Sequence, residues 1–106
     1  MLLSLVLVAP AAGHQRGTSW PVAKTMRLVD DKRVHVGARV VRVDVETTLC
    51  SGEGRATRRG GVRVWRHFRC TFTTFTRVGP GRDIEFRVHP LDSRRIAITD
   101  THWVVG

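Results

Sequence analysis

The stretch that decides the fold is VRVWRHFRCTFTTFT, residues 62–76 of a 106-residue chain. Its apolar side chains share one parity, which is the pattern of a strand with one buried face: Val62, Val64, Phe68, Cys70 and Phe72. Phe75 leaves that parity, so we expect a β-bulge near Thr73 and Thr74. The pattern predicts one long strand whose other face displays Arg63, Trp65, His67 and Arg69 in a single row.

Three further segments show the same alternation. Residues 41–45 alternate valine with charged side chains, which predicts a strand from near residue 34 or 38 to near residue 49. Residues 84–88 alternate large apolar with charged side chains and predict a third strand. Residues 94–99 predict a fourth, which residues 102–105 continue or pair at the edge. Gly79-Pro80-Gly81 is typical of a turn, and strands joined by such short connections are antiparallel.

A helix is predicted over residues 20–31. Ser19 can cap it, and Pro21 suits its first turn. Val22, Met26 and Val29 follow at i, i+4 and i+7 and form one helical face. The alternative is a strand over residues 25–29. The sequence therefore predicts an α+β fold in two layers, with one N-terminal helix packed on a four-stranded antiparallel meander in a single domain over residues 19–106.

The two cysteines, Cys50 and Cys70, are predicted to form a disulfide. Gly60-Gly61 lies midway between them and can supply the positive φ angles of a hairpin turn. A hairpin folded there places Cys50 opposite Cys70, and the cross-link would stabilise the fold by about 3 kcal/mol. The alternative is a metal site that also uses His67. Because the chain has no C-x-x-C, we expect no metal site.

The first residues are typical of a processing segment. Residues 2–9, LLSLVLVA, form an uncharged apolar run, and Ala9-Pro10-Ala11 has the A-x-A form of a signal-peptidase site. The run is shorter than the ~20 residues that span a bilayer. The sequence predicts a signal peptide over residues 1–12, a leader over residues 13–18, and a secreted or extracytoplasmic protein with no membrane span in the mature chain. No basic residue precedes the apolar run, and a buried N-terminal strand is the alternative.

Two short motifs carry a resemblance. Residues 50–54, CSGEG, have the form C-x-G-x-G, and residues 68–70, FRC, have the form F-x-C. With a leader peptide and a helix before them, they resemble a class of small exported bacterial proteins of unknown function. The resemblance implies export and a cystatin-like or PepSY-like helix on a meander over most of residues 20–105, and it implies no activity. A cystatin-like fold suggests an alternative function, the inhibition of an extracellular hydrolase by residues 51–61.

Positive charge is the main functional signal. The chain has 18 Lys and Arg residues against 9 Asp and Glu residues, a net charge of +9, and no acidic residue lies between Glu53 and Asp83. Arginine binds phosphate or carboxylate through a planar fork, and tryptophan offers a stacking surface. We therefore predict a polyanion-binding surface formed by Arg58, Arg59, Arg63, Trp65, His67 and Arg69. The alternatives are a merely solvated outer face, or a sheet covered on both sides with Trp65 facing the helix.

No residue is predicted to be catalytic. The glycines of residues 52–54 are not followed by the G-K-[ST] of a phosphate-binding loop. Four of the five histidines fall on separate predicted elements: His35, His67, His89 and His102. We expect a non-catalytic binding domain without a cofactor, whose partner is an acidic polymer or a protein, with nucleic acid less favoured. The sequence does not indicate an oligomeric state.

Overall fold

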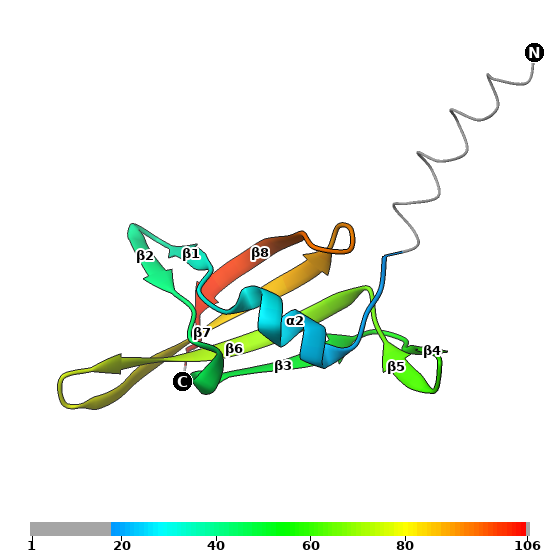
Figure 1. Cartoon of the computed structure of the whole chain (residues 1–106). Helices are drawn as coiled ribbons and strands as arrows, with labels where there is room; N and C mark the ends of the chain where they lie inside the picture. Colours follow the sequence, from blue (N-terminus) through cyan, green and yellow to red (C-terminus); the bar gives the residue numbers. More distant parts are fainter. Residues whose placement is uncertain (1–17, 106) are drawn as a thin grey trace, which may run out of the picture.

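The computed structural model describes residues 18–105 (Figure 1). The predicted signal peptide over residues 1–12, and the predicted leader up to residue 17, lie outside the described residues. The elements are α2 Val22–Val29, β1 Arg33–Val36, β2 Arg39–Arg42, the 3-10 turn η1 Val45–Thr47, β3 Thr48–Glu53, β4 Thr57–Arg59, β5 Val62–Val64, β6 His67–Thr76, β7 Gly79–Pro90 and β8 Ile96–Trp103. The strands form a four-stranded sheet of order β3-β6-β7-β8 and two separate hairpins, β1–β2 and β4–β5, all antiparallel.

The core lies on one face of the four-stranded sheet. The apolar residues of β6 and β7 alternate with polar residues and pair across the two strands, so they gather on a single face. The buried set comprises Phe68, Cys70, Phe72, Ile84, Phe86 and Val88. The parity predicted for the residues of β6 and β7 is confirmed, whereas Val62, predicted on the same buried face, is exposed.

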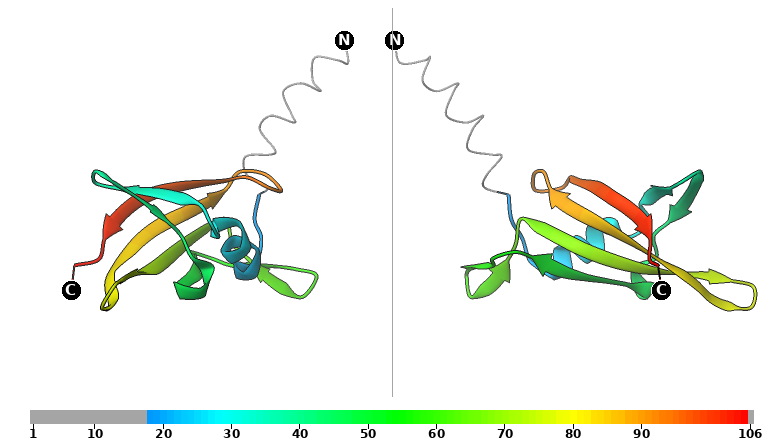
Figure 2. Two further views of the ribbon diagram at one scale, coloured as in Figure 1. Left: turned by 60° about the vertical axis from the view of Figure 1, so that its left-hand side comes forward. Right: turned by 180° about the vertical axis from the view of Figure 1, so that it is seen from behind.

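Two different elements cover this apolar face. Helix α2 packs over the β3 side of the sheet, and the β1–β2 hairpin lies against β8 (Figures 1 and 2). Thr25 and Val29 of the helix are buried, as are Val34 and Val36 of the hairpin. A hairpin therefore shields the half of the sheet that the helix is too short to reach.

The predicted fold class, one helix on a four-stranded meander in two layers, is wrong. The described chain is mostly β structure in three sheets, with a single short α-helix. The helix spans eight residues instead of residues 20–31, and Pro21 takes the N-cap position expected for Ser19. Residues 41–45 do not form one strand, because β2 ends at Arg42 and η1 begins at Val45. The chain has already reversed at Gly37, whose φ of 62° suits a tight turn.

Residues 62–76 form two strands where one was predicted. β5 ends at Val64, Trp65 makes an isolated bridge with Trp20, and β6 begins at His67. Partner numbers sum to 121 in the β4–β5 ladder but to 120 in the β3–β6 ladder, so the pairing is interrupted between the two. The β4–β5 hairpin consequently forms a sheet of its own.

The predicted disulfide is confirmed. Cys50 and Cys70 lie directly opposite each other on β3 and β6, and their sulfur atoms are 2.03 Å apart. The predicted glycine turn is also confirmed, because Gly60 and Gly61 join β4 to β5 with φ angles of 61° and 82°. The cross-link joins the edge strand β3 to the inner strand β6.

The β6–β7 connection differs from the prediction. The expected bulge is present between Thr73 and Phe75. The turn expected at residues 79–81 lies earlier, at residues 77–78, because Thr76 already pairs with Gly79. Beyond the bulge these strands form a two-stranded ribbon that projects from the sheet (Figure 1).

Candidate functional site

The outer face of the four-stranded sheet, turned away from α2, carries a polar cluster. Seen from behind, this face is not crossed by any other element of residues 18–105 (Figure 2). The side chains that gather here come from all four strands: Glu53 from β3, His67 and Arg69 from β6, Glu85, Arg87 and His89 from β7, and Thr99, Asp100 and His102 from β8. We call these residues the outer cluster.

Glu53 holds the centre of the outer cluster. Its Oε2 atom lies 3.1 Å from Nη2 of Arg69 and 3.4 Å from Nη2 of Arg87. These two arginines face each other directly in the β6–β7 register. Arg87 also pairs with Asp100, with 3.2 Å between Nη1 and Oδ2. Both arginines are therefore neutralised within the protein.

Two histidines stand beside this ion-paired group. The Nδ1 atoms of His67 and His89 are 2.8 Å apart, and Nε2 of His89 lies 2.7 Å from Oγ1 of Thr99. One Nδ1 must donate and the other must accept, so only one of the two facing nitrogens carries a proton. Burial, followed by the nearby His67, lowers the pKa of His89 below its ordinary value.

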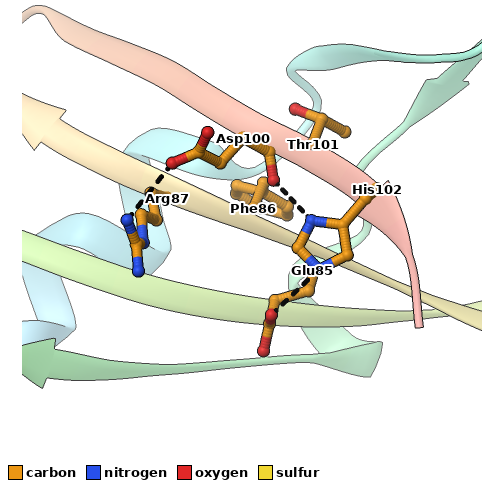
Figure 3. Close-up of a pocket in the computed structure, with 6 residues that line it drawn as sticks. All are labelled: Glu85, Phe86, Arg87, Asp100, Thr101 and His102. Carbon is orange, nitrogen blue, oxygen red and sulfur yellow. Dashed lines mark hydrogen bonds and ion pairs between the residues drawn. The ribbon is translucent and has the colours of Figure 1, made fainter. Parts of the chain in front are cut away.

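A bulge shapes the β8 side of the outer cluster (Figure 3). Glu85 pairs with His102 and Arg87 with Thr99, so Asp100 and Thr101 together face Phe86 alone. Asp100 has a φ of 53°, which is uncommon outside glycine. The bulge places two pairs of acidic and basic side chains on the outer face. Glu85 lies 3.1 Å from His102, and Asp100 pairs with Arg87. A depression of about 430 Å³ lies between them.

The arginines next to the sheet are different, because no acidic side chain neutralises them. The β4–β5 hairpin and its two flanking segments carry Arg55, Arg58, Arg59, Arg63 and Arg66, all in the gap between Glu53 and Asp83. None of the five has an ion pair with a residue of the described chain. Arg58 bonds the carbonyl of Gly61, and the guanidinium of Arg63 lies 5.5 Å from the ring centre of Trp65. We call this group the arginine hairpin.

The arginine hairpin and the outer cluster adjoin. A depression of about 520 Å³ lies between them, and its lining includes Arg55, Arg59 and Arg66 with Glu53 and His67. A second concavity of about 350 Å³ continues onto the sheet and shares Glu53, Gly54 and His67 with the first.

The predicted row of Arg63, Trp65, His67 and Arg69 is not a single row. Arg63 belongs to the hairpin, whereas His67 and Arg69 belong to the outer face of the sheet. Trp65 is half-buried between these two units, packs against the core and contacts Phe68 edge-to-face. Residues 51–61, proposed as an inserting loop, comprise the end of β3, strand β4 and the glycine turn. Whether the six predicted residues bind a polyanion stays a prediction.

A metal site that uses the cysteines is ruled out, because both sulfur atoms are in the disulfide. Nowhere in residues 18–105 do three or more His, Cys, Asp or Glu side chains form a group that could hold a metal ion.

Comparisons with known proteins found no match among family models, curated proteins or solved structures. The resemblance to small exported proteins therefore stays a prediction. Within the described part of the chain, no helix is long and apolar enough to cross a bilayer.

Sequence reasoning missed the meeting of His67 with His89 and of Glu53 with Arg87. The available signal was the alternation of polar and apolar residues along β7, which places Glu85, Arg87 and His89 on one face. That parity indicates a polar face, but only the strand register shows which residues of β6 lie opposite.

Proposed function

We propose that this chain is an exported, non-catalytic domain that binds an acidic polymer through the arginine hairpin. The observation that supports the proposal is the contrast between two sets of arginines. Arg69 and Arg87 of the outer cluster are neutralised by Glu53 and Asp100, whereas the five arginines of the hairpin face solvent without an acidic partner. Guanidinium groups that have no acidic partner and are gathered on one hairpin attract a chain of anionic groups.

A polymer is favoured over a protein as the partner. Protein interfaces are centred on buried aromatic or aliphatic anchors. The arginine hairpin offers only one strongly exposed apolar side chain, Val62, and its one aromatic neighbour, Trp65, is already packed against the core. The surface therefore suits repeated carboxylate, sulfate or phosphate groups better than an apolar patch.

Export is part of the proposal and rests on two features. The Cys50–Cys70 disulfide is of the kind that persists in oxidising compartments. Residues 2–11 have the apolar run and the A-x-A site of a signal peptide. Intact-mass analysis of protein recovered from the medium would check both the cleavage site and the absence of alkylatable thiols.

Retention on immobilised heparin tests the binding surface. The double variant Arg58→Ala, Arg59→Ala should bind about tenfold more weakly at low salt, because two phosphate- or sulfate-binding charges are lost together. The matched control is Arg27→Ala, Arg33→Ala, which removes the same charge from exposed positions on α2 and β1. Equal loss in both variants would overturn the hairpin as the binding surface. Retention should also fall steeply between about 50 and 200 mM salt, whereas inhibition of a hydrolase by loop insertion would be far less sensitive.

A further inference from the structure

The outer cluster breaks a rule of sheet stability. Arg69 and Arg87 lie directly opposite each other on neighbouring strands, and the next cross-strand pair along the same face is His67 with His89. Like charges that face each other across strands are destabilising. Positions that break a local rule in a folded protein are expected at functional sites. Four basic side chains placed together in this way favour the binding of an anion.

Glu53 supplies an anionic group at this place from within the protein. One oxygen, Oε2, accepts a hydrogen bond from Arg69 and forms an ion pair with Arg87, and so occupies the position that an oxygen of a bound anion would take. Its side chain is 27% exposed. Solvent therefore reaches the carboxylate through the concavity that Glu53, Gly54, His67, Arg87 and His89 line. An incoming anion could compete with it without any change in the core.

The histidine pair adds a proton-controlled charge to the same concavity. When both rings are protonated, each facing Nδ1 carries a hydrogen, and the 2.8 Å contact between them must open. Polar and charged groups from all four strands face the pair. They are Glu53 from β3, Arg69 from β6 and Arg66 just before it, Arg87 from β7, and Thr99 and Asp100 from β8. Acidification thus frees two N–H donors and adds positive charge beside Arg87.

We propose that this concavity binds one tetrahedral oxyanion, a phosphate or sulfate group, which replaces the Glu53 carboxylate at Arg87 and is held more tightly once His67 and His89 are both protonated. The proposal rests on the proposed function only for the source of that group, an acidic polymer that also lies on the arginine hairpin. The adjoining depressions allow one polymer to reach both places.

The test uses sulfate and phosphate ions alone, so its result is independent of heparin retention. Sulfate keeps the same charge between pH 5.5 and pH 7.5, and a change in its affinity therefore reports the protein's own protonation. Binding is followed through the imidazole NMR signals of His67 and His89, with His35 as the internal reference because it lies on β1. We expect the His67 and His89 signals to shift on titration and sulfate to bind several-fold more tightly at pH 5.5. Phosphate should shift the same signals, and a response to only one ion would identify which of the two groups the site accepts.

Replacement of Glu53 and of the paired histidines, with one charge-matched control, decides the mechanism. Glu53→Gln removes the internal competitor and should tighten sulfate binding several-fold at both pH values. Asp92→Asn makes the same charge change in the turn after β7, outside the lining of the concavity, and should not tighten it beyond a general charge effect. The double variant His67→Gln, His89→Gln should abolish most of the pH dependence, and His89→Gln alone should reduce it.

The proposal is overturned if Asp92→Asn tightens binding as much as Glu53→Gln, or if His35 shifts as much as the paired histidines. If Glu53→Gln does not fold, the pH dependence of the unmodified protein and its loss in the double variant His67→Gln, His89→Gln decide the question. Sulfate affinity that is the same at pH 5.5 and 7.5 would then refute the proposal.

Discussion

The indole ring of Trp65 lies directly on the backbone of Gly52, so a β-carbon at Gly52 would overlap the ring. Gly52 is on the edge strand β3, and Trp65 is the residue at which the β4–β5 hairpin joins the sheet. Trp65 is also held by two backbone hydrogen bonds to Trp20, of 3.0 and 3.1 Å. Gly52 on the sheet and Trp20, which precedes α2, together fix the junction from which the arginine hairpin projects.

Gly52→Ala is therefore expected to destabilise the protein by about 1–3 kcal/mol, the usual range for overpacking. The added methyl group must displace the ring or bend β3. Urea unfolding followed by tryptophan fluorescence would measure the change. Trp65→Ala is the companion variant, because removal of the ring should make Gly52→Ala nearly neutral in that background. Equal effects in both backgrounds would show that the ring is not what excludes a side chain at Gly52.

Reduction of the disulfide is expected to lower the free energy of unfolding by about 3 kcal/mol. Cys50 and Cys70 are 20 residues apart in sequence, and the bond closes the loop that contains the whole β4–β5 hairpin. Denaturant midpoints with and without a reductant would give the difference. The double variant Cys50→Ala, Cys70→Ala should show a comparable loss. An unchanged midpoint in the variant would mean that the unfolded chain gains little freedom when the link is absent.

The disulfide and the buried faces of β6 and β7 were predictable because each depends on local information. A strand alternates its faces by geometry, so the parity of Phe68, Phe72 and Phe86 survives even where the strand limits are wrong. The Cys50–Cys70 pair depends on one turn, and Gly60-Gly61 marks that turn.

The outer cluster and the β1–β2 hairpin were not predictable in the same way. With a turn centred on Pro80, as expected, His67 would face Ser93; the turn at residues 77–78, together with the one-residue shift at the bulge, brings it opposite His89 instead. A small displacement of one turn thus changes every partner across two strands. The β1–β2 hairpin, which ends at Arg42, could not be recognised because valines alternate with other residues both within it and after it. Only the chain reversal decides which sheet these valines join.

Asp92 is expected to titrate at an unusually low pH. The backbone N–H of Arg94, then the side chain and backbone N–H of Arg95, donate to its carboxylate and lower its pKa from 3.8 to about 2. Because the pKa is lower in the folded state, the stabilisation that Asp92 provides is present above its unfolded pKa of 3.8 and is lost as the pH falls towards 2. Carboxyl-carbon NMR would measure the titration. Arg95→Ala should raise the pKa only in part, because the backbone donors remain, and a full return to 3.8 would contradict this assignment.

Arg63 and Arg69 should differ in their effect on polymer binding although each carries one charge. Arg69 already donates to Glu53 at 3.1 Å, whereas Arg63 has no acidic partner and lies over the face of Trp65. Arg63→Ala is therefore expected to weaken heparin retention more than Arg69→Ala does. Arg69→Ala should behave like the exposed control Arg27→Ala, because Glu53 is left with Arg87 as its remaining partner. Salt-gradient elution of the three single variants, each checked for native circular dichroism, measures the difference. If Arg69→Ala gave the larger loss, the neutralised outer face rather than the hairpin would be the surface that the polymer contacts first.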